Sequence, residues 1–369
     1  MSPKNRRIGA SLGLALIWVA SVGCRGEPPA APAVTQLTQA EAEAFGRAFV
    51  EHVSRCDSAA LEEDIDADAI VARAVADRRV SDKQIADARK GLRGTDRCAN
   101  ATGETYTYLR TQMIGGRPQP MLRSIAGAAG FNYVRLQLAK RGGRVRAVDE
   151  YYFSSGTWTT ETIRMTVDAK ERQFAATLER IDDARRAGKR DEARALLRAL
   201  PADVRTTKLM MTAELNLFDP GDPKYLVALD AFAKTFAGDP SMVFHEIDRN
   251  LLHKDFDGLL GAIARLDAVV GGDPYLDVVR AAVFRMLGKR SDAIAAAKRA
   301  TSAEPTLRDA WMVLASLQIA SKDFAGALRT LEVLRDRFGM RTDAASLRTV
   351  DELAELPDTP EYAEWSKRQ

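Results

Sequence analysis

The metal-ligating side chains of this sequence are few, and their spacing argues against a catalytic centre. Residues 245–249 (HEIDR) place one histidine on an expected helix, but a chelating pair needs a second imidazole where Arg249 stands. Acidic residues occupy every second position of residues 64–68, as in a calcium-binding loop. Such a loop, however, needs glycine and glutamate where this sequence has Ala69 and Val75. The sequence also lacks a glycine-rich phosphate loop and a nucleophile elbow. We therefore expect no metal, no cofactor and no enzymatic activity.

The chain has 369 residues, which is enough for two or three domains, and 46% of them are hydrophobic. Lys and Arg number 54 against 51 Asp and Glu, and three of the basic residues lie within the first seven positions. Without that segment the count is 51 against 51, so the body of the protein is close to neutral. A neutral body argues against nucleic acid as a partner.

The N-terminal residues have the pattern of an export signal. Basic residues precede an uncharged stretch over residues 8–23, which as a helix of 16 residues spans about 24 Å, less than the roughly 30 Å of a bilayer core. Residues 20–24 (ASVGC) resemble a bacterial lipobox, although Ser21 stands where leucine is usual. The resemblance implies a signal peptide over residues 1–23, cleavage before Cys24, and lipid on the Cys24 thiol. An uncleaved N-terminal anchor is the alternative.

Residues 24–37 are rich in proline and alanine, which suits an extended tether. The residue after Cys24 is Arg25 and not the aspartate that retains lipoproteins at the inner membrane in well-studied Gram-negative bacteria. We therefore expect an exported protein that is anchored by lipid in the outer membrane and faces the periplasm.

If Cys24 carries lipid, Cys56 and Cys98 remain as one pair in an oxidising compartment. A bridge between them would close a loop of about 40 residues and contribute roughly 3–4 kcal/mol. Two buried free thiols are the alternative.

Residues 38–168 are expected to form an α+β domain in which helices precede an antiparallel sheet. Residues 38–41 (TQAE) have the spacing of a capping box, and apolar residues follow at helical intervals. Further helices are predicted over 67–76 and 82–92, and a strand over 104–113. Residues 133–138 alternate like a half-buried strand, and Gly142-Gly143 supplies a hairpin turn before a second strand that ends near Phe153.

This order of elements resembles the NTF2-like and cystatin-like folds, in which a helix packs into a curved sheet. Some relatives with an NTF2-like fold enclose a cavity that contains a buried aspartate base or a tyrosine donor. The resemblance implies a candidate cavity at Tyr133, Asp149 and Tyr151, and hence an alternative function in small-ligand binding or catalysis. That alternative requires Asp149 to point into a cavity, and it fails if Asp149 pairs with an arginine.

Residues 169–339 show a 34-residue repeat, first visible in the recurrence of residues 238–240 (GDP) at 272–274. Apolar residues recur in the same phase in unit after unit. Four such columns are Ala213, Ile247, Ala281, Ala315; Tyr225, Leu259, Ala293, Ala327; Leu229, Ile263, Ala297, Leu331; and Phe232, Leu266, Ala300, Leu334. The register predicts about five helix pairs that bury equivalent faces. Residues 340–369 are predicted to provide a capping helix near 342–355 and a tail.

The repeats resemble the tetratricopeptide repeat family. Its pattern maps onto the last unit at Trp311, Leu314, Ala315, Ala327, Leu331 and Leu334, and onto the preceding unit at Ala281, Phe284, Ala293, Ala297, Ala300 and Pro305. The resemblance implies an all-α solenoid in which the first helix of each pair lines a groove for a protein or peptide. The candidate groove residues are Met210, Glu214, Phe244, Asp248, Val278, Arg285 and Met312. Ordinary interhelical core is the alternative for this column. The sequence therefore predicts a non-catalytic scaffold lipoprotein that binds a protein partner, with envelope assembly or secretion as its setting.

Overall fold

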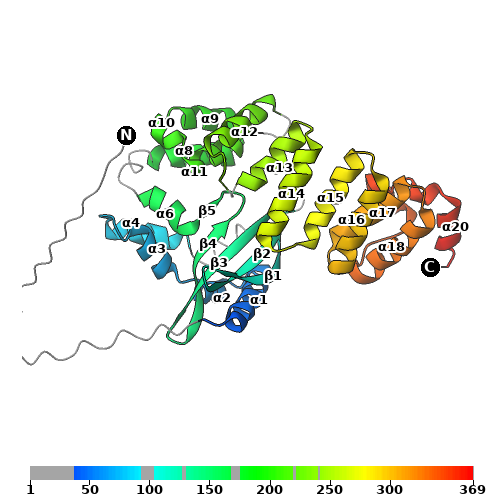
Figure 1. The fold of residues 1–369 in the computed structure, drawn as a ribbon, viewed down its shortest axis with the longest axis horizontal. Coiled ribbons are helices and arrows are strands. Elements are labelled where there is room, and N and C mark those ends of the chain that lie inside the picture. Colours follow the sequence, from blue (N-terminus) through cyan, green and yellow to red (C-terminus); the bar gives the residue numbers. More distant parts are fainter. Residues whose placement is uncertain are drawn as a thin grey trace, which may run out of the picture. The chain divides into compact units, whose positions relative to one another are not determined.

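A computed structural model describes residues 37–92, 104–126, 130–167, 175–218, 222–239 and 242–368. The predicted signal peptide, the lipid site Cys24 and Cys98 lie outside these residues. Residues 36–369 group into one compact unit that contains both a sheet and a long series of helices (Figure 1).

The sheet contains five antiparallel strands in the order β1-β2-β3-β4-β5. Their bounds are β1 (Thr105–Ile114), β2 (Arg117–Ile125), β3 (Phe131–Arg141), β4 (Arg144–Tyr152) and β5 (Thr157–Trp158). Gly142 and Gly143 join β3 to β4 with φ angles of 56° and 81°, which glycine adopts without strain. The predicted hairpin is therefore present, and the α+β character of this region is confirmed.

One face of the sheet is covered by the N-terminal helices and by the helix that follows β5. These are α1 (Gln39–Arg55), α2 (Ser58–Asp64), α3 (Ala67–Val75), α4 (Asp82–Lys90) and α6 (Thr159–Val167). The predicted capping box starts α1: the Glu41 N–H donates to Thr38 Oγ1 at 3.2 Å, and the Thr38 N–H donates to Glu41 Oε2 at 2.9 Å. Phe49 of α1 packs in the same core as Leu122 and Val134 of the sheet.

Helices dominate the rest of the chain and form five successive pairs within the described residues. The pairs are α8 (Ala175–Arg186) with α9 (Arg190–Arg198), α11 (Lys208–Leu215) with α12 (Pro223–Thr235), α13 (Val243–Leu252) with α14 (Phe256–Val270), α15 (Pro274–Met286) with α16 (Arg290–Ala303), and α17 (Arg308–Ala320) with α18 (Phe324–Phe338). A four-residue helix, α10 (Ala202–Arg205), lies between the first two pairs.

The 34-residue columns explain why these helices pack. The two columns that begin at Leu229 and Phe232 place one residue in each second helix from α12 to α18, and all eight side chains are at most 1% exposed. Charged residues surround them, so burial of these positions is the apolar driving force for stacking the pairs. The predicted helical solenoid is confirmed.

The C-terminal end differs from the single capping helix expected near 342–355. It contains α19 (Ala344–Leu347), two short 3₁₀ turns at Asp351–Leu353 and Leu356–Asp358, and α20 (Pro360–Ser366). Tyr362 and Trp365 of α20 pack with Leu331 and Leu334 of α18, so the last pair is covered by a folded-back segment.

Candidate functional site

The second face of the sheet is covered by the helical repeats, which we did not predict from the sequence. Met121, Tyr133 and Phe153 share a core with residues of α13, α14 and α15, among them Ile247 and Leu266. The side chains of β3 alternate between the two helical layers: Val134 and Leu136 lie in the core with α1, and Tyr133 lies in the core with the repeats.

This packing fills part of the candidate groove. Phe244 of α13 lies with its ring centroid 5.3 Å from that of Phe131 and 6.0 Å from that of Tyr133. Val278 of α15 is buried in a cluster that also includes Ile125 of β2. Along α13 and α15 the groove column therefore contacts the protein's own sheet.

A buried ionic cluster joins the same two parts. Arg123 of β2 donates to Asp273 Oδ1 at 2.6 Å and to the two carboxylate oxygens of Glu304 at 2.9 and 2.7 Å. Tyr133 donates to the other oxygen of Asp273 at 2.6 Å. Burial and the negative charge of Asp273 raise the pKa of Tyr133 well above its ordinary value, so the phenol stays protonated.

The edge strand β1 also contacts the repeats. The Arg110 guanidinium donates to the carbonyl oxygens of Gly271 and Gly272, and Gln112 donates to the carbonyl of Val269 at 3.1 Å. These carbonyls end helix α14, where unpaired C=O groups favour a cation.

Three of the candidate groove residues lie in other contacts. Met210 is buried among α8, α9 and α11, so it is interhelical core. Glu214 faces Arg198 Nε at 3.4 Å, and Asp248 accepts a hydrogen bond from the Tyr225 hydroxyl at 2.9 Å. The structure therefore does not gather the column from Met210 to Met312 into one continuous groove.

Arg285 and Met312 do lie together, in a pocket of about 160 Å³ on the last two helix pairs. Its other lining residues are Ala281, Ala282, Val313, Ser316, Leu317 and Glu352. Glu352 belongs to the C-terminal segment, for which we predicted a capping helix and no groove residue. The pocket combines an apolar floor with one cation and one anion.

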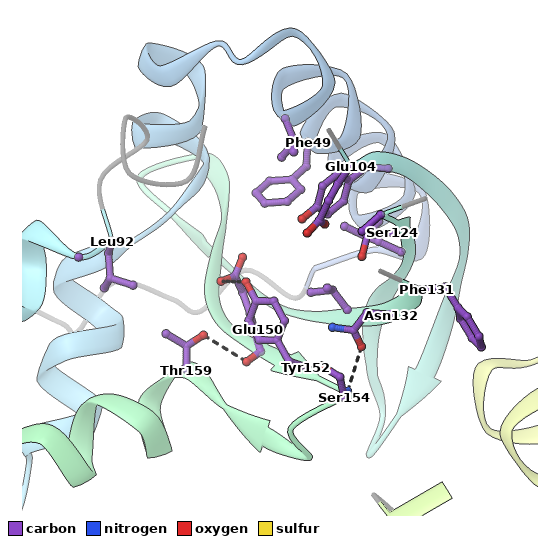
Figure 2. Close-up of a pocket in the computed structure, with 17 residues that line it drawn as sticks. Phe49, Leu92, Glu104, Ser124, Phe131, Asn132, Glu150, Tyr152, Ser154 and Thr159 are labelled. Atoms are coloured by element: carbon purple, nitrogen blue, oxygen red, sulfur yellow. Dashed lines mark hydrogen bonds between the residues drawn. The ribbon is translucent and has the colours of Figure 1, made fainter. Parts of the chain in front are cut away.

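A larger cavity of about 580 Å³ lies between α1 and the sheet (Figure 2). Its lining includes Phe49 of α1, Tyr106 of β1, Ser124 of β2, Asn132 of β3 and Glu150 of β4. None of the three residues that we predicted to line a cavity is among its lining residues.

The three candidate residues (Tyr133, Asp149 and Tyr151) lie outside the cavity because successive side chains of a strand point to opposite faces of the sheet. Glu150 and Tyr152 line the cavity, whereas their neighbours Asp149 and Tyr151 do not. Tyr133 likewise packs with the repeat helices, while Asn132 and Val134 line the cavity. The choice of these three residues as a cavity site is therefore not supported.

Asp149 pairs with an arginine, which is the arrangement that excludes Asp149 as a catalytic base. Arg73 Nη2 lies 3.3 Å from its carboxylate, and Thr160 donates to that carboxylate from both its hydroxyl and its backbone N–H. Burial raises the pKa of Asp149, while the bonds from Thr160 and Glu150 and the charge of Arg73 oppose the rise. Asp149 therefore links β4, α3 and α6 as a structural carboxylate.

His245 is a partly buried residue of α13 that packs against Phe232. Its ring centroid lies 4.5 Å from that of Phe232, and burial lowers the pKa of His245 to about 4. Within the described residues no group of three or more histidine, cysteine or acidic side chains could hold a metal ion. In that same part of the chain, no helix combines the length and apolar character of a membrane span.

Cys56 follows α1 in the left-handed conformation and is disulfide-bonded. Its expected partner Cys98 lies outside the described residues, so the pairing of the two stays a prediction.

Comparison with known protein families finds a match in one segment of the helical solenoid. Residues 285–350, from the end of α15 to the turns after α19, match the family described as Tetratricopeptide repeat. The chain therefore contains tetratricopeptide repeat sequence, which generally mediates protein–protein interaction. No curated protein matches the chain.

Proposed function

We propose that this protein is a membrane-tethered scaffold that holds a protein partner on its last two helix pairs. In this proposal Cys24 carries the lipid anchor, the body lies in the periplasm at the outer membrane, and the protein has no catalytic activity. Envelope assembly or secretion is the proposed setting.

The observation that carries the proposal is the pocket at Arg285, Met312 and Glu352. Five of its eight lining residues, among them Arg285 and Met312, lie in the segment that matches the repeat family. The pocket stays open, whereas the sheet covers the positions equivalent to Met312, which are Phe244 on α13 and Val278 on α15. Among the described residues neither Arg285 nor Glu352 forms an ion pair with another side chain, so both charges are available to a partner.

The lining suggests the chemistry of the partner. Met312, Val313 and Leu317 would receive an apolar anchor side chain, and a methionine adapts its shape to such an anchor. Arg285 and Glu352 would pair with charges beside that anchor. We therefore expect a short amphipathic segment of a partner protein at this site.

The test uses the full-length lipidated chain with a photo-reactive amino acid at position 312 or at position 227. Val227 is an exposed apolar residue of α12, 70% accessible, and is the matched control because it lies away from the pocket. We expect a specific cross-linked partner from position 312 and none from position 227.

The purified partner then gives the quantitative measurement. Met312→Glu places a charge on the apolar floor and should weaken binding by about tenfold or more, whereas Val227→Glu should leave it unchanged. Equal effects of the two substitutions, or cross-linking from 227 alone, would refute the proposed site.

A second candidate function, small-ligand binding by the N-terminal region, is favoured by the 580 Å³ cavity. This volume is in the range of sites that enclose small molecules.

A further inference from the structure

Arg135 of β3 lies on the face of the sheet that is turned toward the repeats. Strand pairing places Met121 of β2 and Tyr151 of β4 on either side of it, and Tyr151 in turn lies opposite Trp158 of β5. Residues paired in this way share one face of a sheet, and both Met121 and Tyr151 pack with the repeat helices. Arg135 is therefore separate from the cavity between α1 and the sheet, and it is not among the residues that line that cavity.

Aromatic rings surround the guanidinium of Arg135. Its Cζ atom lies 4.9 Å from the ring centroid of Tyr151, 5.3 Å from that of Trp158 and 5.9 Å from that of Phe153. The faces of such rings attract a cation, but they do not replace the hydrogen bonds that its N–H groups make with water. The rings thus hold the planar group in place without satisfying its donors.

The guanidinium has no acceptor among the residues that the structure describes. Arg135 forms no hydrogen bond or ion pair with any of them, and its Nε atom is buried without a partner. The residue is partly exposed, and Nη1 and Nη2 are not among the buried unpartnered atoms, so solvent or a ligand can reach them. Burial of a charged donor without an acceptor is costly, and such a group in a folded protein indicates a water molecule or an ion at the site.

Two other arginines on the same face have acceptors within the protein. Arg123 donates to two carboxylates, and Arg110 donates to two carbonyl oxygens at the end of α14. Burial alone would lower the pKa of Arg123, but its carboxylate partners raise the pKa above the ordinary value. Burial lowers the pKa of Arg135, and the group that opposes this is the phenol of Tyr151. No described carboxylate therefore compensates the charge of Arg135.

We propose that Arg135 binds the carboxylate group of a small ligand that has an apolar or aromatic body. A guanidinium offers two parallel N–H donors, which match the two oxygens of a carboxylate, and the surrounding rings provide apolar contact for the body of the ligand. One guanidinium neutralises the single charge of a carboxylate, whereas a phosphate dianion would need a second cation. The inference goes beyond the proposed scaffold function and does not depend on it.

The test uses benzoate, its neutral analogue benzamide, and inorganic phosphate. Each is added to the full-length chain in detergent micelles at neutral pH, where the guanidinium is charged. Ligand-observed NMR measures the binding of benzoate and benzamide, and phosphate is added as a competitor of benzoate. We expect saturable binding of benzoate, binding of benzamide that is at least about tenfold weaker, and displacement by phosphate only at a several-fold higher concentration.

Substitutions assign the binding to one side chain. Arg135→Met removes the charge and should weaken benzoate binding about tenfold or more, while Arg135→Lys keeps the charge without the paired donors and should weaken it several-fold. The matched control is Arg47→Met, because Arg47 also lies over a ring, that of Tyr108 at 4.7 Å, but is exposed and paired with Glu43 at 2.8 Å. This control should leave binding unchanged. Circular dichroism checks that each variant is folded, and Arg135→Lys provides the readout if Arg135→Met does not fold.

Each contrary outcome identifies what is wrong. Benzoate binding that neither substitution of Arg135 weakens, equal binding of benzoate and benzamide, or no saturable benzoate binding would overturn the inference, and in the last case water alone satisfies the guanidinium. Displacement of benzoate by an equal or lower concentration of phosphate would overturn the choice of a carboxylate. None of these results bears on the partner pocket at Met312.

Discussion

Arg123 of β2 and Asp273 at the start of α15 form an ion pair of 2.6 Å although their side chains are only 1% and 0% exposed. Asp273 is also the N-cap of α15, accepting a hydrogen bond from the Tyr275 N–H at 3.1 Å. The same carboxylate thus starts a repeat helix and holds the sheet against it. The pairing adds a buried ionic contact to the apolar core and the β1 hydrogen bonds that also join the sheet to the repeats.

Replacing Arg123 should strongly destabilise the protein. Arg123→Met would leave the carboxylates of Asp273 and Glu304 without their cation, and removal of one partner of a buried pair costs about 3–5 kcal/mol. The measurement is the free energy of unfolding from urea denaturation followed by circular dichroism.

An exposed pair gives the control for that experiment. Arg348 and Asp358 lie 2.6 Å apart but at 52% and 69% exposure, so Arg348→Met should change the free energy of unfolding by less than about 1 kcal/mol. A loss of similar size in both variants would show that burial of the Arg123 cluster has no special role.

His245 should make stability depend on pH in the acidic range. Burial lowers the pKa of His245 from 6.5 to about 4, so between these values the unfolded chain binds more protons than the folded one. The contribution of His245 is therefore complete above pH 6.5 and is lost as the pH falls toward 4. The shift corresponds to about 3 kcal/mol.

The measurement compares wild type with His245→Phe at pH 7 and pH 4.5. From pH 7 to pH 4.5 the free energy of unfolding should fall by about 2 kcal/mol more in wild type than in the variant. Ile247→Val, at a buried position of the same helix that does not titrate, is the control and should lose as much as wild type over this interval. If the free energies of unfolding of wild type and His245→Phe differ by the same amount at pH 7 and at pH 4.5, the prediction is wrong.

Much of the architecture could be predicted because it depends on local pattern. The capping box at Thr38, the Gly142-Gly143 turn and the 34-residue columns each involve interactions close in sequence or repeated at fixed spacing. Strand β2 was missed because Pro118 and Pro120 argue against a central strand. The strand pairing explains their presence. Both prolines pair with β1, and β3 pairs with β2 from Met121 onward. Among the described strands, only β1 therefore lies beside the two prolines.

The candidate site could be predicted only in part, because it depends on contacts between distant segments. Nothing local to Phe244 or Val278 shows that the sheet would cover them. A usable signal was present in β3, where Phe131 and Tyr133 alternate with Val134 and Leu136, since apolar residues on both faces of a strand indicate layers on both sides. That signal also assigns Tyr133 to the helical layer and away from the cavity.

The pairing of Cys56 with Cys98 should be detectable by peptide mapping without reductant. We expect one linked peptide that contains both residues, and no free thiol in the folded, lipid-modified chain. Because the bridge closes a loop of about 40 residues, reduction should lower the free energy of unfolding by roughly 3 kcal/mol. A linked peptide that joins Cys56 to a cysteine other than Cys98, or a free thiol at Cys98, would contradict the pairing.

Lipid attachment at Cys24 should decide whether the protein associates with membranes. Its thiol follows an uncharged stretch too short to span a bilayer fully, and within the described residues no helix could serve as a membrane span, so the acyl chains would supply the anchor. Cys24→Ser should therefore move the exported protein from the detergent phase to the aqueous phase in a phase-separation assay, and mass spectrometry of the wild-type N-terminal peptide should show diacylglycerol on Cys24. The double substitution Cys56→Ser and Cys98→Ser is the control, because it removes the other two thiols and should leave partitioning unchanged. If mass spectrometry shows that the wild-type protein keeps residues 1–23 and carries no lipid on Cys24, the uncleaved signal segment is the anchor and the lipoprotein assignment is wrong.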